Sequence, residues 1–320
     1  MIMVFGATGF VGRYLCINLK NKGKKVLALG RSKNVGNFFK ENGVDFQYYD
    51  ATDDSSFDAL PTEGIECVIN LAAITGKHEV PVEKFFEVNT IGTYKTLEFC
   101  RKNKIKKYIL ASMHKLYNDI DKETISEKDH PKYRGDHTPF IISKIAAENF
   151  VEYYNKDFGM DGMIFRFTGV HGYGEFFGRL HQDGTRTKST FEIFINKALE
   201  GETIEVWGDI YLKRDHIYVK DLIEVLEKGA ESQGRKGVYN IASGHGSTVL
   251  EEAEAIADAF AVDKKSKVIY MPEKKGLQRG YVYDISKAKK DFDWEPKYKL
   301  EEMVKDYKKE MDREFFHFRK

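Results

Sequence analysis

Cysteine is scarce in this chain, which has three among its 320 residues: Cys16, Cys67 and Cys100. The three lie far apart, two of them fall in apolar runs, and no CxxC or Cys/His spacing occurs. Disulfide frameworks and thiolate metal sites need cysteines at defined, close spacings. The sequence therefore predicts three buried free thiols in a reducing compartment, and no metal site.

An excess of charge of one sign is also missing, because 51 Lys and Arg stand against 50 Asp and Glu, for a net charge of +1. Without such an excess there is no bulk electrostatic attraction to nucleic acid or to an anionic membrane. No apolar run approaches the roughly 20 residues that a membrane-spanning helix needs. The chain enters a predicted strand, Ile2–Phe5, without a signal-peptide pattern. We therefore expect a cytoplasmic protein with no nucleic-acid partner and no membrane partner.

The first half of the chain alternates short apolar runs with longer amphipathic stretches. The runs typical of strands are Ile2–Phe5, Lys25–Leu29, Phe46–Tyr49, Cys67–Leu71, Tyr108–Ala111 and Met163–Phe167. The helical patterns between them are Val11–Lys22, Val35–Asn42, Lys84–Lys102 and Ser143–Phe158. Strands that alternate with helices predict an α/β fold with a doubly wound parallel sheet of the Rossmann type.

From about residue 169 the pattern loosens into a glycine-rich stretch with Gly172, Gly174, Gly178 and Gly184. The helical patterns that follow are Thr190–Glu200, Lys220–Lys228, Thr248–Phe260 and Leu300–Glu310, and the strand patterns are Glu205–Trp207, His216–Val219 and Val238–Ile241. We expect a first domain at 1–168 and a smaller, mostly C-terminal second domain at 169–320. Residues 212–245 are expected to return to the first domain.

A glycine-rich turn joins the first predicted strand to the first predicted helix: Gly6-Ala7-Thr8-Gly9-Phe10-Val11-Gly12. Glycines allow a tight turn and a close approach of the backbone to a pyrophosphate. The N-terminus of the helix adds free N–H groups and partial positive charge. Strand, turn and helix occur in the order that a dinucleotide site requires; the alternative is a plain strand-to-helix turn. We expect the cofactor to contact Gly6, Thr8, Gly9, Phe10, Val11 and Gly12.

The end of the second predicted strand bears on the choice between NAD and NADP. An acidic residue there would bind the ribose 2′-hydroxyl and indicate NAD, but the strand ends Leu29-Gly30-Arg31-Ser32. Arg31 can accept a 2′-phosphate, with Ser32 as a second donor. This favours NADP over NAD. The alternative is that Arg31 is a surface cation and that NAD binds without the acid.

One segment resembles a known family. Pro139-Phe140-Ile141-Ile142-Ser143-Lys144-Ile145-Ala146-Ala147-Glu148 is similar to the Pro-Tyr-x-x-Ser-Lys-x-x-Ala-Glu stretch of extended short-chain dehydrogenases/reductases. This is the NAD-dependent epimerase/dehydratase family, whose members act on nucleotide sugars. The resemblance covers nearly the whole chain, up to Trp294-Glu295-Pro296. It implies a homodimer formed by the helices Lys84–Lys102 and Ser143–Phe158. It also implies cofactor contacts for Asp50, Ala51, Leu71, Ala72, Ala73 and Asn89.

Two hydroxyl groups that the family uses look absent. In the family the tyrosine moves the proton and the lysine lowers its pKa, but here Phe140 stands four residues before Lys144. A serine or threonine is also expected four residues before Tyr117, where this chain has Met113. Ser112 can replace it only if the strand shifts by one residue, and the period of two then turns its side chain to the other face. We expect Ser112, Met113 and Phe140 to line the substrate. General acid–base catalysis contributes roughly 10²–10⁴ in rate, which a phenyl ring cannot supply.

Other groups are candidates for the proton transfer. His114 and Lys115 follow the strand at the place where dehydratases of the family carry an Asp-Glu or Asp-Lys pair. A histidine titrates near neutrality, and a desolvated lysine can act as an acid. The alternative is that His114 packs at the strand end while Lys115 points to water. We expect Lys144 to bind the nicotinamide ribose, and it is also a candidate for a catalytic role. Further candidates are Tyr117, Tyr133 and His137.

The second half carries family-like stretches for a substrate. Arg166–Gly172 resembles Arg-x-x-Asn-Val-Tyr-Gly, with Gly169 and His171 in place of the asparagine and the tyrosine. Lys213–Asp221 resembles the family signature whose arginine, here Arg214, clamps a diphosphate, and bidentate guanidinium chemistry suits that role. The resemblance further implies substrate contacts for Arg179 and Arg279, with Arg186 close to Arg179 in the same glycine-rich segment.

The sequence thus favours an enzyme, an NAD(P)-dependent nucleotide-sugar epimerase, dehydratase or ketoreductase with an atypical active site. The alternative is a catalytically inactive protein that binds the dinucleotide or the nucleotide sugar. The missing hydroxyls motivate that alternative, and the family resemblance does not decide between the two.

Overall fold

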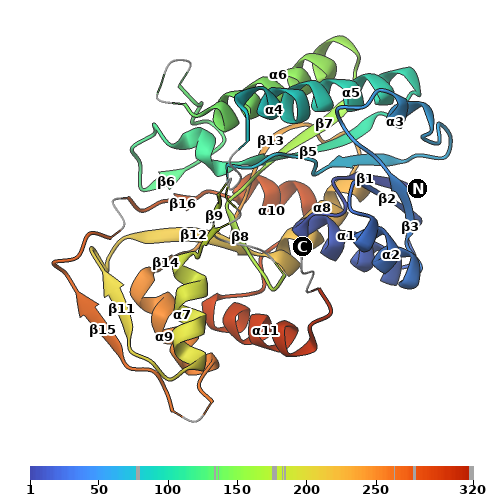
Figure 1. Cartoon of the computed structure of the whole chain (residues 1–320). Coiled ribbons are helices and arrows are strands. Elements are labelled where there is room, and N and C mark those ends of the chain that lie inside the picture. Colours follow the sequence, from blue (N-terminus) through green and yellow to red (C-terminus); the bar gives the residue numbers. More distant parts are fainter. Residues whose placement is uncertain are drawn as a thin grey trace.

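The computed structural model describes residues 1–76, 80–132, 135, 137–174, 179–181, 183, 185–262, 264–276 and 279–316, with backbone alone at 179, 180 and 186. Within these ranges a seven-stranded sheet has the order β13-β7-β5-β4-β1-β2-β3 (Figure 1). All of its strand pairs are parallel. The strands are β1 (Ile2–Phe5), β2 (Val26–Gly30), β3 (Asp45–Tyr48), β4 (Cys67–Asn70), β5 (Lys107–Met113), β7 (Asp161–Phe167) and β13 (Gly237–Ile241).

Strand β1 marks the point where the chain changes direction across the sheet. Phe5 at its carboxyl end pairs with Leu29 of β2 on one side and with Asn70 of β4 on the other. The connections that leave β1 and β4 run to opposite faces of the sheet. In doubly wound sheets this leaves a crevice beyond the carboxyl ends, and ligands bind there.

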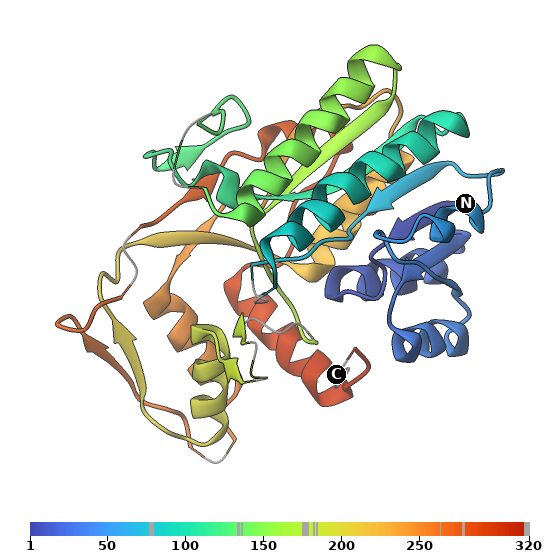
Figure 2. The same ribbon diagram turned by 45° about the horizontal axis from the view of Figure 1, so that its top comes forward.

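Helices cover both faces of the sheet (Figures 1 and 2). One face carries α1 (Phe10–Asn21), α2 (Lys33–Glu41), α8 (Val219–Glu231) and α10 (Ser286–Phe292), and the other carries α3 (Ser55–Asp58), α4 (Val82–Phe85), α5 (Gly92–Lys102) and α6 (Pro139–Asp157). Along β5, Tyr108 and Leu110 belong to the core beneath α5 and α6, whereas Ile109 and Ala111 belong to the core beneath α1 and α8. This alternation follows from the two-residue period of a strand. The predicted fold class is confirmed.

Two helices differ from their predicted bounds. The pattern Lys84–Lys102 predicted one α-helix, but a π-helical stretch, η1 (Phe86–Ile91), lies between α4 and α5. An apolar period cannot reveal a single π turn, a rare feature that is frequent at functional sites. Helix α6 begins at Pro139 rather than Ser143, because the side chain of Thr138 caps it by accepting from the N–H of Ile141 at 3.4 Å.

The chain after β7 lies mostly beyond the carboxyl ends of the sheet. Its elements there are β8 (Gly169–His171), β9 (Arg179–Leu180), β10 (Arg186–Thr187), α7 (Thr190–Leu199), β11 (Ile204–Trp207), β12 (Lys213–Tyr218), β14 (Gly246–Thr248), α9 (Val249–Ala259), β15 (Val268–Met271) and α11 (Leu300–Arg313). Strand β12 pairs with β8 and β14, and β11 pairs with β15. The short strands β6 (Thr124–Ile125) and β16 (Val282–Tyr283) pair with each other. The division into domains at residue 168 stays a prediction.

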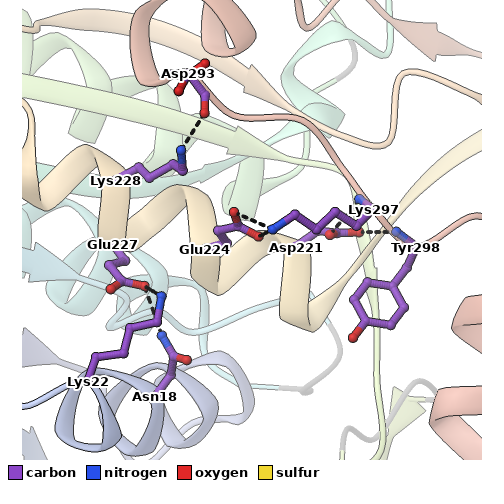
Figure 3. Close-up of polar contacts among 9 residues, drawn as sticks. All are labelled: Asn18, Lys22, Asp221, Glu224, Glu227, Lys228, Asp293, Lys297 and Tyr298. Carbon is purple, nitrogen blue, oxygen red and sulfur yellow. Dashed lines mark hydrogen bonds and ion pairs between the residues drawn. The ribbon is translucent and has the colours of Figure 1, made fainter.

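Side chains of helix α8 make polar contacts with α1 and with the segment that precedes α11 (Figure 3). Lys22 at the end of α1 lies 2.6 Å from Oε2 of Glu227. At the other end of α8, the buried carboxylate of Asp221 accepts hydrogen bonds from the N–H groups of Lys297 and Tyr298, at 2.9 and 3.1 Å. These contacts hold α1 by the end opposite to the glycine-rich turn.

The cysteine prediction is confirmed as far as burial is concerned. Cys16, Cys67 and Cys100 are free and buried, and burial raises the pKa of the Cys67 thiol to about 12. None of the helices in the described ranges combines the length and apolar composition that a membrane crossing requires.

Candidate active site

The glycine-rich turn touches the loop after β4 at one point. Gly6 has a φ of +74°, and a Cβ atom there would lie 2.5 Å from the backbone nitrogen of Ala72. Gly12 is packed just as tightly against Ala7, because a Cβ atom at Gly12 would lie 2.5 Å from Cα of Ala7. Only glycine fits both positions, and the two close approaches keep the turn narrow at the crevice.

The start of α1 has the features of an anion site. Gly9 is its N-cap and makes no side-chain capping bond. Its N–H donates to the carbonyl of Gly6 at 3.0 Å. The first N–H groups of the helix, among them those of Phe10 and Val11, have no partner within the helix. They fit a pyrophosphate oxygen. Thr8 packs at the end of β2, because a Cβ atom on Gly30 would lie 2.6 Å from its Oγ1.

Arg31 and Asp50 lie together beyond β2 and β3. Nη1 of Arg31 is 3.8 Å from Oδ2 of Asp50, and the arginine side chain is 63% exposed. Burial raises the pKa of Asp50, but hydrogen bonds from Thr52 and the charge of Arg31 outweigh it, so the net pKa is lowered. Ser32 caps α2 by accepting from the N–H of Val35 at 3.4 Å. Its hydroxyl hydrogen is left to donate.

The other residues that we expect to contact the cofactor follow the carboxyl ends of β3 and β4. Ala51 is buried and packs against Gly92. A Cβ atom added to Gly92 would lie 3.1 Å from the Cβ atom of Ala51. The N–H of Leu71 donates to the carbonyl of Phe5 at 2.9 Å. Ala72 is partly buried and Ala73 is exposed, so the loop after β4 presents backbone to the crevice.

The side-chain amide of Asn89 forms hydrogen bonds within the protein. Its Oδ1 accepts from the N–H of Ile74 at 2.8 Å, and its Nδ2 donates to the carbonyl of Ile74 and to Oγ of Ser143, both at 3.0 Å. Both amide hydrogens are thereby used. The predicted contact of Asn89 with the cofactor stays a prediction, while its side chain positions the loop after β4 against α6.

Met113 and Phe140 share one apolar cluster. Its members are Met113, Leu116, Phe140, Ile141 and Ile145. The ring of Phe140 also lies 6.0 Å from that of Phe85. Neither Met113 nor Phe140 can donate or accept a proton, so these two residues supply no acid or base.

Ser112 faces the interior. Its Oγ donates to Oε1 of Glu148 at 2.5 Å, and Glu148 accepts two further bonds from Arg166, at 3.0 and 2.5 Å. Strand β5 pairs with β7 without a shift, with Ser112 opposite Arg166 and Met113 opposite Phe167. The predicted substrate contact of Ser112 stays a prediction, although the hydroxyl hydrogen is used by Glu148 in this structure.

Lys144 is held at the carboxyl end of β5. Its side chain is buried, and Nζ donates to the carbonyl of Ala111 at 2.8 Å. Burial lowers the pKa of Lys144 to about 8, against the opposing charge of Glu148. An amine with that pKa exchanges a proton readily near neutral pH.

His114 is neutral at pH 7. Its Nδ1–H donates to the carbonyl of Phe167 at 3.0 Å, which leaves Nε2 without a proton. Burial lowers the pKa of His114 to about 4; the bond to Phe167 opposes this, while the charges of Lys115 and Arg214 add to it. Such an imidazole is a weaker base than we expected. Lys115 is exposed, so it lacks the desolvation that its acid role requires.

The three further candidates are not equally placed. The hydroxyl of Tyr117 donates to Oδ1 of Asn240 at 2.8 Å, and burial raises its pKa to about 12. Nε2 of His137 donates to the carbonyl of Lys132 at 3.0 Å. Tyr133 lies outside the described residues. Tyr117 and His137 are thus occupied by partners within the protein.

The predicted substrate arginines fall in two groups. Arg214 lies on β12, and its charge acts on the carboxyl of Glu252 and on the hydroxyl of Tyr281. Arg279 donates to the carbonyl of Asn118, next to the 3₁₀ turn η2 (His114–Tyr117). The side chains of the other two arginines, at positions 179 and 186, lie outside the described part of the chain.

A comparison with known families decides the class. The model of the NAD dependent epimerase/dehydratase family matches residues 2–242. The chain belongs to this family. The match includes the glycine-rich turn, Lys144 and Arg214, so the predicted family is confirmed. The replacement of the family's tyrosine by Phe140 rests on the sequence resemblance and stays a prediction.

Relatives of this epimerase/dehydratase family member match over nearly the full length. It is 28% identical over 329 residues to the UDP-glucose 4-epimerase of Bacillus subtilis, covering 95% of each chain. The UDP-glucose 4-epimerase of Thermotoga maritima, solved with UDP-glucose, is 25% identical, with a TM-score of 0.77 and 98% coverage of each chain. The UDP-N-acetylglucosamine 4-epimerase of Bacillus cereus has a TM-score of 0.78 at 24% identity, covering 97% of this chain and 96% of its own. That last likeness shows the fold.

The residues present fit a nicotinamide dinucleotide. The narrow turn at Gly6 and the uncapped start of α1 would hold its pyrophosphate. Lys144 would lie at the nicotinamide end of the crevice, where β5 ends. Within the described ranges, no three His, Cys, Asp or Glu side chains come together as a metal site requires.

Sequence reasoning missed Glu252. It is buried on α9, in the stripe that also contains Val249, Ala253 and Ile256. Oε1 of Glu252 lies 3.4 Å from Nε2 of His216. The signal was available, because an acid at an apolar position of a helical pattern marks a buried charge.

Proposed function

We propose that this family member is a nucleotide-sugar epimerase or dehydratase in which Lys144 replaces the missing tyrosine as acid and base. The observation that carries the proposal is the position of Lys144, which is buried at the end of β5 with a pKa of about 8. It lies one helical turn after Phe140, on the same face of α6.

The proton chemistry follows from this position. A bound nicotinamide cofactor supplies hydride acceptance and return at a sugar carbon. As the hydride leaves, the sugar hydroxyl must lose a proton, and the neutral amine of Lys144 accepts it. The ammonium then returns the proton to the sugar oxygen as the hydride comes back, which completes an epimerisation. His114, neutral with a free Nε2, would accept a hydrogen bond from the substrate and orient it.

A nucleotide sugar is the substrate class that the remaining residues fit best. Arg214 is a cation on β12, and an arginine binds a diphosphate through two parallel hydrogen bonds. The relatives reported above are named for UDP-sugars, which supports the class and leaves the sugar to be found. We extend the proposal to a homodimer, because Ile91, Tyr94, Ile142 and Tyr153 expose apolar surface on η1, α5 and α6.

We propose further that Arg31 favours NADP over NAD. Its exposed guanidinium, with the hydroxyl of Ser32 beside it, fits a 2′-phosphate. Asp50 at 3.8 Å opposes this by adding negative charge. The family is described as NAD dependent, so the preference needs a direct measurement.

The experiment is proton NMR of the purified protein with NAD or NADP and UDP-, GDP-, dTDP- and CDP-sugars. A new sugar signal that disappears in Lys144→Met would support the proposal. Lys107→Met is the matched control, because Lys107 is also buried and also donates to a backbone carbonyl, that of Ala230, at 2.6 Å.

A second candidate is a binding protein without turnover. The apolar cluster of Met113 and Phe140 favours it, since both expected hydroxyls are replaced by packed carbon. This candidate predicts that the cofactor and a nucleotide sugar bind with ordinary affinity while the NMR spectrum of the sugar does not change. Turnover by the wild-type protein would exclude it.

A further inference from the structure

Glu252 is a buried acid next to the arginine that we assign to the diphosphate. It lies on α9, where the other buried positions are the apolar residues Val249, Ala253, Ile256 and Ala257. An acid in such a stripe costs stability unless its carboxyl has partners. The partners of the Glu252 carboxyl therefore decide what this buried acid does.

The partners of Glu252 come from β12, which carries Arg214, and from β14, which pairs with it. The hydroxyl of Ser247, on β14, donates to Oε1 of Glu252 at 3.2 Å, and Ser247 is the pairing partner of Arg214. Nε2 of His216 lies 3.4 Å from the same oxygen. Arg214 and His216 are two residues apart on β12, so their side chains share one face of the strand.

The charges around Glu252 are few. Burial raises its pKa to about 7, the charge of Arg214 opposes this, and Glu251 adds to it. Burial lowers the pKa of His216 far below its usual value, and the charges of His171 and Arg214 act in the same direction. The titratable groups that interact by charge with Glu252 or His216 are Glu251 on α9 itself and, on the neighbouring elements, His114, His171, Arg214, His216 and Tyr281. Arg214 is the cation of this set at neutral pH.

We infer that Glu252 is a positioning residue whose charge attracts Arg214 in the free protein, and that it takes up a proton when a diphosphate binds, which leaves Arg214 to the substrate. This inference rests on the proposed function, because it assumes that Arg214 binds the diphosphate. A diphosphate diester brings two negative charges to Arg214 and repels the neighbouring carboxylate. Protonation of that carboxylate removes the repulsion and leaves Arg214 to the ligand.

The sign of the pH dependence follows from linkage. A bound diphosphate raises the pKa of Glu252 above its value of about 7 in the free protein. Binding therefore takes up a proton, and affinity is highest at low pH. It falls as pH rises through the free-state pKa and levels off above the pKa of the complex. In between, the dissociation constant rises by about tenfold per pH unit.

The test is calorimetric titration with UDP-, GDP-, dTDP- and CDP-sugars at pH values on both sides of neutrality. These probes are diphosphate diesters, without the phosphomonoester proton that titrates near pH ~6, so any uptake belongs to the protein. Each titration is run in two buffers of different ionisation enthalpy, which counts the protons directly. We expect the wild-type protein to take up protons and to lose affinity as pH rises.

Two variants on α9 form a matched pair. Glu252→Gln keeps the size and removes the charge, and we expect its affinity to vary by less than about twofold with pH, without proton uptake. Glu254→Gln removes an exposed charge from the same helix and is expected to behave as the wild type. A merely structural role of Glu252 would change the melting temperature and leave the pH slope in place.

Three outcomes overturn the inference. Binding by the wild type without proton uptake does so even if Glu252→Gln fails to fold. A Glu252→Gln protein that keeps the wild-type pH slope does so as well. If none of the four nucleotide sugars binds at any pH, the assignment of Arg214 fails, and the proposed function falls together with this inference.

Discussion

Met113 of β5 and Phe140 of α6 pack in the same apolar cluster at the carboxyl end of the sheet. By resemblance, these are the two positions at which the family carries its reacting hydroxyls. The two side chains that stand in place of the hydroxyls pack in one cluster. Neither hydroxyl is therefore missed as a hydrogen-bond partner by the other position. Lys144, a group that can move a proton, lies one helical turn further along α6.

Phe140→Tyr tests this relationship. The new hydroxyl would enter an apolar cluster and cost about 1–3 kcal/mol of unfolding free energy if it finds no partner. It would also place a phenol beside Lys144, so we expect turnover to rise by at least about tenfold. Denaturant unfolding and steady-state turnover measure the two effects. Phe140→Leu is the control without a hydroxyl, and equal turnover in both variants would contradict the prediction.

Gly6→Ala tests the narrow turn. The added Cβ atom would lie 2.5 Å from the backbone of Ala72 at a φ of +74°, so we expect a loss of about 2–4 kcal/mol in stability. Cofactor affinity should fall at least about tenfold, because the turn must move away from the pyrophosphate. Gly23→Ala is the matched control, since Gly23 has a φ of +75° with nothing within 4 Å. It should cost only the conformational strain and leave affinity unchanged; equal effects of the two variants would disprove the close-approach account.

Arg31→Ala tests the choice of cofactor. Removing the guanidinium takes away a charge-assisted bond to a 2′-phosphate, so we expect NADPH to bind about tenfold or more weakly. NADH, which has no such phosphate, should keep its affinity within about threefold. Fluorescence titration with both reduced cofactors measures this. A parallel loss of both affinities would show that Arg31 acts on the adenosine or on Asp50 instead.

Ile142→Glu tests the homodimer. Ile142 is 44% exposed on α6, and α6 lies beside α5 (Figure 2). A charge in the middle of an apolar interface is costly to bury, so we expect the variant to sediment as a monomer while the wild type sediments as a dimer. Val262→Glu changes a more exposed apolar residue, 67% exposed, away from these helices, and should stay dimeric. A wild-type monomer would end the proposal.

The sheet and the phosphate-binding turn could be predicted because their signals are local. Each strand of the first half is a short apolar run, and Gly6 and Gly12 mark positions where a side chain does not fit. The start of α6 was placed too late, because Thr138 and Pro139 set it while the apolar period begins further along the chain. The π turn at Asn89 leaves no periodic signature of its own.

The chemistry of the site depended on tertiary contacts that no single segment shows. His114 was expected to titrate near neutrality, but burial under its neighbours lowers its pKa to about 4. Ser112 and Asn89 were assigned to ligands from family motifs, and both side chains are used inside the protein. The helical pattern marks Glu252 as a buried acid, but its partners lie on β12 and β14, which the sequence does not place beside α9.

The most direct test of the account is the rate at which a nucleotide sugar reduces the bound cofactor, followed against pH in a single turnover. The proposed base is the neutral amine of Lys144, whose pKa is about 8. The rate should rise about tenfold per pH unit below that value and level off above it. Lys144→Met should be at least about a hundredfold slower, while Lys107→Met stays close to the wild type. A wild-type rate that does not change with pH, or an active Lys144→Met protein, would contradict the central claim.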